Sequence, residues 1–174
     1  MSDIRNVQDS VDEGSVNLGT VKAAAEVNRA QIEHRATWMA LIYDEMIKAG
    51  IDAEQIIRRA IKRCGHIHGE SIKKRCADPE NCEAFKNAFL NDLGIKTFDM
   101  RPISADKNSL SVDFHYCALV NAWKKIGLDD KTCELLCDMA MDGDRGIAEV
   151  MGLEFDLGRT IAQGCPDCKL KFHK

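Results

Sequence analysis

The sequence contains no apolar run that approaches the roughly 20 residues of a membrane-spanning helix. Residues 1–17 are polar and acidic and lack the apolar core of a secretory signal. The formal net charge is −4, and no pattern of basic and aromatic residues offsets it, so nothing indicates a nucleic-acid surface. These absences favour a soluble cytoplasmic protein that binds neither a membrane nor nucleic acid.

Internal repeats and low-complexity segments are also absent, so the 174 residues are expected to form a single domain. Residues 1–18 hold few large apolar side chains, and they include Gly14 and Ser15. Such a segment cannot bury enough apolar surface to order itself, and we expect a mobile arm there. The folded domain then covers residues 19–174.

Helical periodicity dominates the first half of the chain. From Thr20 to Lys48, apolar residues recur three or four positions apart and form one stripe: Ile32, Ala36, Met39, Tyr43 and Met46. The pair Asp52 and Gln55 then has the spacing of a helix cap. The apolar face of this second helix is expected at Ile56, Ile57, Ala60, Ile61, Cys64 and Ile67.

Gly65 and Gly69 lie inside the second helix, where each costs about 1 kcal/mol relative to alanine. They either let another backbone or a ligand come close, or break the helix. A third helix is expected over 80–92, after Pro79 and before Gly94.

Strand signals follow in the second half. Alternation predicts strands over 96–100, 109–117, 153–157 and 168–172, with a hairpin loop over 102–108 and a turn over 142–146. Short helices are expected over 118–126, over 131–141 and up to residue 151. The sum is an α+β fold in which N-terminal helices precede a small antiparallel sheet with inserted helices.

The strand predicted over 109–117 would carry reactive groups on one face. Asp113, His115 and Cys117 share one parity, and successive strand side chains point to opposite faces. An imidazole one pleat from a thiol can activate a thiolate or bind a metal with it. The alternative is a half-buried histidine that is hydrogen-bonded to Asp113 or to the backbone.

The sequence has eight cysteines, which are not expected to form structural disulfides in a cytoplasmic protein. Most of them can be small buried residues. Cys165 and Cys168 have the spacing of a metal or redox pair, but a second pair at zinc-ribbon spacing is absent. Cys133 and Cys137 share a helical face and could complete a four-thiolate zinc or iron–sulfur site. For Cys133 we favour the alternative, burial in the core.

The segment Asp142-Gly143-Asp144-Arg145-Gly146 combines two carboxylates and a guanidinium between glycines. It is similar to half of a calcium loop, but the remaining spacing of an EF-hand is missing. An arginine can bind a small carboxylate through two hydrogen bonds, and a neighbouring aspartate can hold an amidino group. The alternative is a salt-linked junction between helices.

Several strings together resemble the L-2-amino-thiazoline-4-carboxylic acid hydrolase family. The match is best over 95–174 and extends more weakly to about residue 30, through Arg35-Ala36-x-Trp38. Cys133 and Cys165 do not belong to the family pattern. The strings are His115-Tyr116-Cys117-x-x-Val120-x-Ala122-Trp123-x-x-x-Gly127-Leu128, Leu136-Cys137-Asp138, Met141 to Gly146, and Leu157 to Gly164 followed by Cys168-x-x-x-Phe172.

The resemblance implies hydrolysis of a cyclic isothiourea, which opens to an N-carbamoyl cysteine. His115 would be the base, and Cys117 or Cys168 the nucleophile or, with His115, the ligands of a metal that activates water. Arg145 would bind the substrate carboxylate, and Asp144 or Asp138 its amidino nitrogen.

Two alternatives remain beside this hydrolase hypothesis. One is a non-catalytic cysteine-rich protein that binds zinc, an iron–sulfur cluster or a small ligand, with Cys165 and Cys168 among the ligands. The other is a scaffold or partner-binding protein, a possible homo-oligomer whose dimer seam is the stripe of the Thr20–Lys48 helix.

Overall fold

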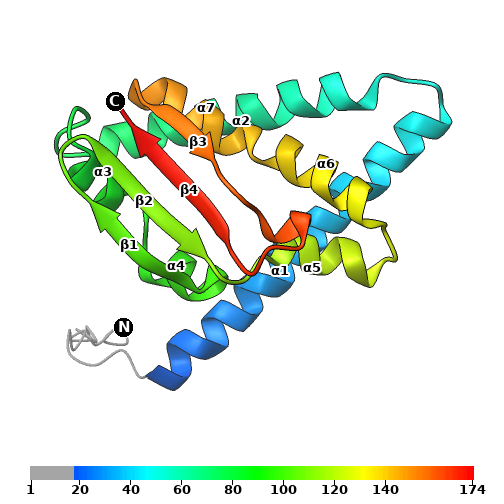
Figure 1. Cartoon of the computed structure of the whole chain (residues 1–174), viewed down its shortest axis with the longest axis horizontal. Coiled ribbons are helices and arrows are strands. Elements are labelled where there is room, and N and C mark those ends of the chain that lie inside the picture. Colours follow the sequence, from blue (N-terminus) through cyan, green and yellow to red (C-terminus); the bar gives the residue numbers. More distant parts are fainter. Residues whose placement is uncertain (1–17) are drawn as a thin grey trace, which may run out of the picture.

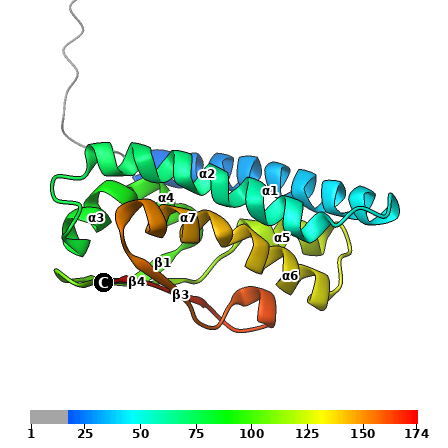
Figure 2. The same ribbon diagram turned by 90° about the horizontal axis from the view of Figure 1, so that it is seen from above.

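The computed structural model describes residues 18–174, which form a layer of helices on one face of an antiparallel sheet (Figures 1 and 2). This arrangement confirms the predicted α+β class. The helices are α1 (Leu18–Lys48), α2 (Ala53–Arg75), α3 (Cys82–Phe89), α4 (Asp92–Phe98), α5 (Ala118–Lys125), α6 (Asp130–Ala140), α7 (Asp142–Met151) and the short 3₁₀ helix η1 (Ile161–Gln163). The strands are β1 (Met100–Ala105), β2 (Ser109–Phe114), β3 (Glu154–Leu157) and β4 (Cys168–His173).

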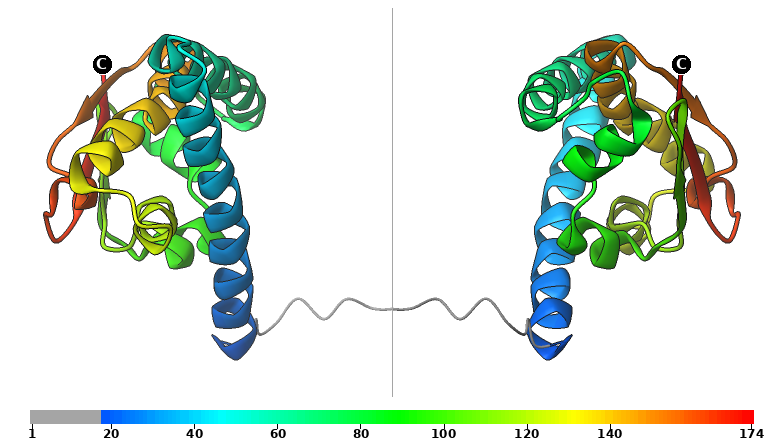
Figure 3. Two further views of the ribbon diagram at one scale, coloured as in Figure 1. Left: turned by 90° about the vertical axis from the view of Figure 1, so that its right-hand side faces the viewer. Right: turned by 90° about the vertical axis from the view of Figure 1, so that its left-hand side faces the viewer.

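The sheet has the order β1-β2-β4-β3, and every neighbouring pair is antiparallel. Helices cover one of its faces and leave the other open (Figure 3). The side chains of β2 and β4 that point into the helical layer are buried, and they include Leu110, Val112, Cys168, Leu170 and Phe172. The alternate positions are more polar and lie on the open face, where Asp113 of β2 pairs with Lys169 of β4.

The stripe predicted for the first helix is buried within its own domain. Ile32 and Ala36 are buried, and Met39, Tyr43 and Met46 pack against the core that surrounds Trp123. The indole Nε1–H of Trp123 donates to the carbonyl of Ala36 at 2.9 Å. This face of α1 therefore packs within its own domain, mainly against α5, and it does not form the dimer seam considered above.

The face predicted for the second helix is wrong in part, because α2 turns its glycines toward α7. Ile56 and Ile67 are 40% and 68% exposed, whereas Gly65 and Gly69 are buried. A Cβ added at Gly65 would lie 2.2 Å from the carbonyl oxygen of Gly143. Since α2 runs unbroken through both glycines, their role is to let another backbone come close.

The turn predicted over 142–146 is also wrong, since these residues are the first part of α7. A Cβ at Gly146 would lie 2.6 Å from the carbonyl oxygen of Lys62. The glycines of this segment therefore allow a close crossing of two helices. A glycine-rich pattern of this kind is compatible with a close helix crossing as well as with a loop.

Three boundaries between residues 80 and 108 differ from the prediction. The helix expected over 80–92 is divided into α3 and α4, because Leu90 is extended and the Asn91 side chain caps a new helix by accepting the Gly94 N–H at 2.8 Å. The strand expected over 96–100 is mostly the end of α4. The expected loop at 102–108 is mostly β1, whose edge position tolerates Pro102.

The predicted arm at 1–18 lies outside the described residues except for Leu18, which begins α1. Within residues 18–174, no helix combines the length and apolar character needed to cross a bilayer.

Candidate functional site

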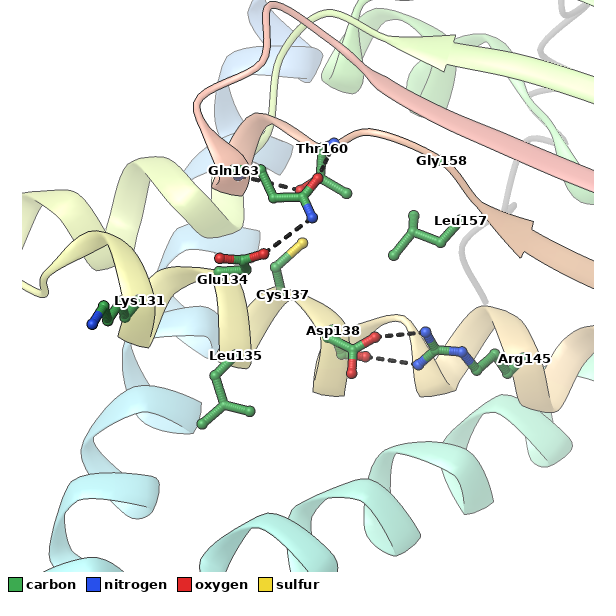
Figure 4. Close-up of a pocket in the computed structure, with 10 residues that line it drawn as sticks. All are labelled: Lys131, Glu134, Leu135, Cys137, Asp138, Arg145, Leu157, Gly158, Thr160 and Gln163. Carbon is green, nitrogen blue, oxygen red and sulfur yellow. Dashed lines mark hydrogen bonds and ion pairs between the residues drawn. The ribbon is translucent and has the colours of Figure 1, made fainter.

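A pocket of about 480 Å³ opens between α6, the start of α7 and the segment that connects β3 to η1 (Figure 4). Its rim is closed on one side by Gln163, whose Nε2 donates to Glu134 at 3.1 Å. The pocket is therefore bounded by two stretches of chain, residues 131–145 and residues 157–163. Its lining residues are Lys131, Glu134, Leu135, Cys137, Asp138, Arg145, Leu157, Gly158, Thr160 and Gln163.

Two lining residues of the pocket, Asp138 and Arg145, belong to a cluster of two arginines and two aspartates. Arg145 donates to Asp138 at 2.6 Å and to Asp142 at 2.7 Å. Arg58 of α2 donates to the other oxygens of the same carboxylates, at 2.6 Å to Asp138 and 3.1 Å to Asp142. Each carboxylate thus bridges both guanidinium groups, so the orientation of Arg145 is held from α2 as well as from α6.

The guanidinium of Arg145 keeps donors for a ligand. Its Nη1 donates to the Asp142 carboxylate and to the Asp138 carbonyl, and its Nη2 uses one N–H for the Asp138 carboxylate. Within the described part of the chain, Nε–H and the second N–H of Nη2 are not used in these bonds. Those two donors form a side-on fork that matches a carboxylate.

Asp138 is held as a carboxylate. Burial opposes its ionisation, but hydrogen bonds from Arg145 and Arg58 outweigh that effect and keep the pKa of its carboxyl below the usual value. It can therefore accept hydrogen bonds from a cationic ligand, but it is a weak proton acceptor.

One cysteine, Cys137, lines the pocket, and two further thiols, Cys117 and Cys168, pack in the neighbouring core. Cys137 comes from α6, and the charges of Cys117 and Cys168 contribute to the raised pKa of its thiol. The hydroxyl of Thr160 hydrogen-bonds to Cys137, and the backbone N–H of Ile161 donates to Cys168 Sγ at 3.2 Å. Cys117 is the N-cap residue of α5, and its side chain makes no capping hydrogen bond to that helix.

The three thiols are protonated at neutral pH. Burial raises the pKa of Cys137 to about 12 and that of Cys168 to about 11, and it also raises the pKa of Cys117. A thiol with a pKa near 12 is ionised in only about one molecule in 10⁵ at pH 7. The site therefore presents neutral sulfur to a ligand.

The predicted metal ligands do not form a coordination group. Cys168 points into the core and Cys165 lies half-buried in the loop before β4. In residues 18–174, no three His, Cys, Asp or Glu side chains are placed to hold a metal ion together. Cys133 is fully buried and its thiol faces the Leu128 carbonyl at 3.9 Å, as the packing alternative expects.

His115 is not among the residues that line the pocket. Its Nε2 bonds to the Arg101 carbonyl at 2.7 Å. Hydrogen bonds from Arg101 lower the pKa of Asp99, and the charge of His115 adds to that effect. The prediction that His115 and Cys117 share a sheet face is wrong, because β2 ends at Phe114 and the chain then turns inward toward α5.

Asp144 lies on the inner face of α7. It belongs to α7, whereas Cys137 belongs to α6, and it is not among the residues that line the pocket. Burial raises the pKa of the Asp144 carboxyl to about 6, although its own backbone N–H and the Arg145 charge favour ionisation. Asp144 is thus an acid that titrates near neutral pH on the helix that also supplies Arg145.

Asp144→Asn should stabilise the protein at neutral pH. The pKa is higher in the folded state than the ordinary 3.8, so folding loses stability as pH rises from about 4 to about 6. The cost at pH 7 is about 3 kcal/mol, and the amide avoids it. Urea unfolding at about pH 4 and pH 7 measures this, with the exposed Asp92→Asn as control. Equal stability of the Asp144→Asn variant and the wild type at pH 7 would contradict the assignment.

The sequence did not single out three residues of this site. Cys137 was considered only as a core residue or a fourth metal ligand, and Thr160 and Arg58 were not considered. Cys137 and Asp138 lie in one string of the family resemblance, which was the available signal. Arg58 gave none, since its partners are 80 and 84 positions away.

Comparison with known proteins gives one match. The family model described as L-2-amino-thiazoline-4-carboxylic acid hydrolase matches residues 29–172. No curated protein and no solved structure matches the chain significantly. The matched range includes every element that builds the pocket, from α2 to the start of β4.

Proposed function

This chain belongs to the L-2-amino-thiazoline-4-carboxylic acid hydrolase family, and we propose that it hydrolyses a small cyclic isothiourea or related amidine that bears a carboxylate. The observation that carries the proposal is the side-on fork of Arg145 on the wall of the pocket. A pocket of about 480 Å³ accommodates a ligand of this size with water beside it.

The substrate has two charged ends, and the pocket offers a partner for each. The carboxylate would bind the unused donors of Arg145, with Lys131 also on the lining. The protonated amidine would bind carboxylate oxygen, from Asp138 at the wall or Asp144 on the inner face. Fixing both ends orients the ring carbon between nitrogen and sulfur for attack.

The reaction adds one water across that carbon. The water oxygen forms a bond to the carbon, and the carbon–sulfur bond breaks. One water proton goes to the ring nitrogen and the other to the departing sulfur, which gives an N-carbamoyl cysteine. Asp144, whose pKa of about 6 lies near neutrality, is the residue we propose to accept and return a proton.

The raised pKa values of the thiols favour direct attack by water over a covalent thiolate intermediate. Cys137, with a pKa of about 12, would first have to lose its proton, and this costs about 7 kcal/mol at pH 7. As a neutral group, Cys137 would instead give the pocket an apolar, polarisable surface that faces the ring sulfur.

The direct test is incubation of the purified protein with L-2-amino-thiazoline-4-carboxylate. Mass spectrometry should detect a product heavier by one water, and its free thiol should appear at the same rate. The ring analogue without the carboxylate should be opened much more slowly, because Arg145 has nothing to bind. Absence of turnover with both compounds and with other cyclic amidino acids would refute the proposal.

A further inference from the structure

We propose that the outer face of α1 is a contact between two copies of this chain, paired antiparallel about a two-fold axis. Opposite the buried stripe, α1 carries a second apolar stripe that faces solvent. Trp38 is 60% exposed, Leu41 51% and Ile42 53%. Single exposed apolar side chains are ordinary, but a tryptophan within a contiguous stripe marks an interaction surface.

A groove lies on the same face, one to three turns beyond Trp38. It has a volume of about 360 Å³, and Glu45 is its one charged lining residue. The ring of Trp38 is held edge-on by His34, with centroids 4.9 Å apart, so the indole is already oriented before it meets a partner. The groove is lined by Leu41, Ile42, Glu45, Met46, Ala49 and Ile51.

A projecting side chain and a groove on one helix face suit a second copy better than an unrelated partner. In a two-fold contact the same patch serves on both sides, so each copy must supply both features. An antiparallel pairing centred near residue 40 sets Trp38 of one copy opposite Ile42 of the other, at the edge of the groove. A buried aromatic anchor in a pocket is the usual centre of such an interface.

The charges on this face select the antiparallel direction. Arg35 precedes the centre by five positions and Glu45 follows it by five, so the pairing sets each Arg35 opposite the Glu45 of the other copy. Glu45 also bonds Lys48 of its own helix at 2.8 Å. A parallel pairing would instead oppose Arg35 to Arg35 and Glu45 to Glu45, which is repulsive.

The contact leaves the pocket open. The helix α1 lies on the side of the helical layer away from the sheet, whereas η1 and β3 lie on the sheet side (Figure 2). Pairing through α1 is therefore independent of the proposed catalytic function, and a failure of one leaves the other untouched.

Light scattering coupled to size exclusion, with sedimentation over a concentration series, tests the proposal on the full chain. We expect a mass twice the 19.4 kDa of one chain. Arg35→Glu and Glu45→Arg should each weaken the dimer about tenfold or more, and the double variant should restore it. Leu41→Asp should give monomers with an unchanged circular dichroism spectrum.

The matched control is Ile67→Asp, since Ile67 is 68% exposed but lies on α2, outside the stripe. That variant should remain dimeric. A wild-type chain that is monomeric throughout the series would overturn the proposal. A monomer that binds phosphatidylserine vesicles would overturn it as well, because the stripe would then contact a membrane surface. So would a dimer that survives both Arg35→Glu and Leu41→Asp, because another surface would then hold it.

Discussion

Arg145→Gln should lower kcat/KM for the thiazoline substrate by about 100- to 1000-fold. The amide cannot reproduce the planar fork that Nε and Nη2 offer to a carboxylate, and loss of such a charged bidentate contact is worth about 3–4 kcal/mol. The variant also removes the hydrogen bonds that Arg145 donates to Asp138 and Asp142, the two carboxylates that Arg58 also binds. Steady-state kinetics, with urea unfolding to verify the fold, measure the effect.

The control for that variant is Arg101→Gln, because Arg101 is exposed and pairs with Asp99 outside the pocket. Its kinetics should equal those of the wild type. The same assay on His115→Ala decides the role of the imidazole. Complete loss of turnover in a folded His115→Ala protein would return His115 to the mechanism as the base. An Arg145→Gln enzyme with unchanged kcat/KM would remove the guanidinium from substrate binding.

Gly65→Ala should destabilise the protein by about 3 kcal/mol or more. The new Cβ would lie 2.2 Å from the Gly143 carbonyl oxygen, which belongs to the backbone of α7 and cannot rotate away. The two helices would have to separate, and the packing of Ile72 against Ile147 would be lost with them. The free energy of unfolding from urea titration gives the magnitude.

Gly143→Ala is the matched control, because it changes the same crossing from the other side. A Cβ at Gly143 would meet its nearest atom, Cγ2 of Ile61, at 3.6 Å, which is ordinary contact. Alanine also favours a helix by about 1 kcal/mol over glycine, so this variant should be as stable as the wild type or more stable. Equal losses at Gly65 and Gly143 would contradict the close crossing.

Local sequence patterns were sufficient for elements whose signal lies within a few residues. The spacing of Ile32, Ala36 and Met39 predicted the buried face of α1, and the alternation from Leu110 to Phe114 predicted β2. Prediction was wrong where one local pattern suits two structures. Gly143 and Gly146 suit a turn as well as a helix crossing, and only the neighbouring α2 distinguishes the two.

By itself the sequence determined the α+β class, the family resemblance and the presence of Asp138, Asp144 and Arg145 as charged groups close together in the chain. Only the tertiary structure decided which groups share a pocket. It brought Arg58 to Asp138 across 80 positions and placed Cys137 in the lining of the pocket, while Cys117, Cys168 and His115 stayed outside that lining. The physical reason is that periodicity reports which face of an element is apolar, whereas the pairing of faces depends on how closely two backbones can approach.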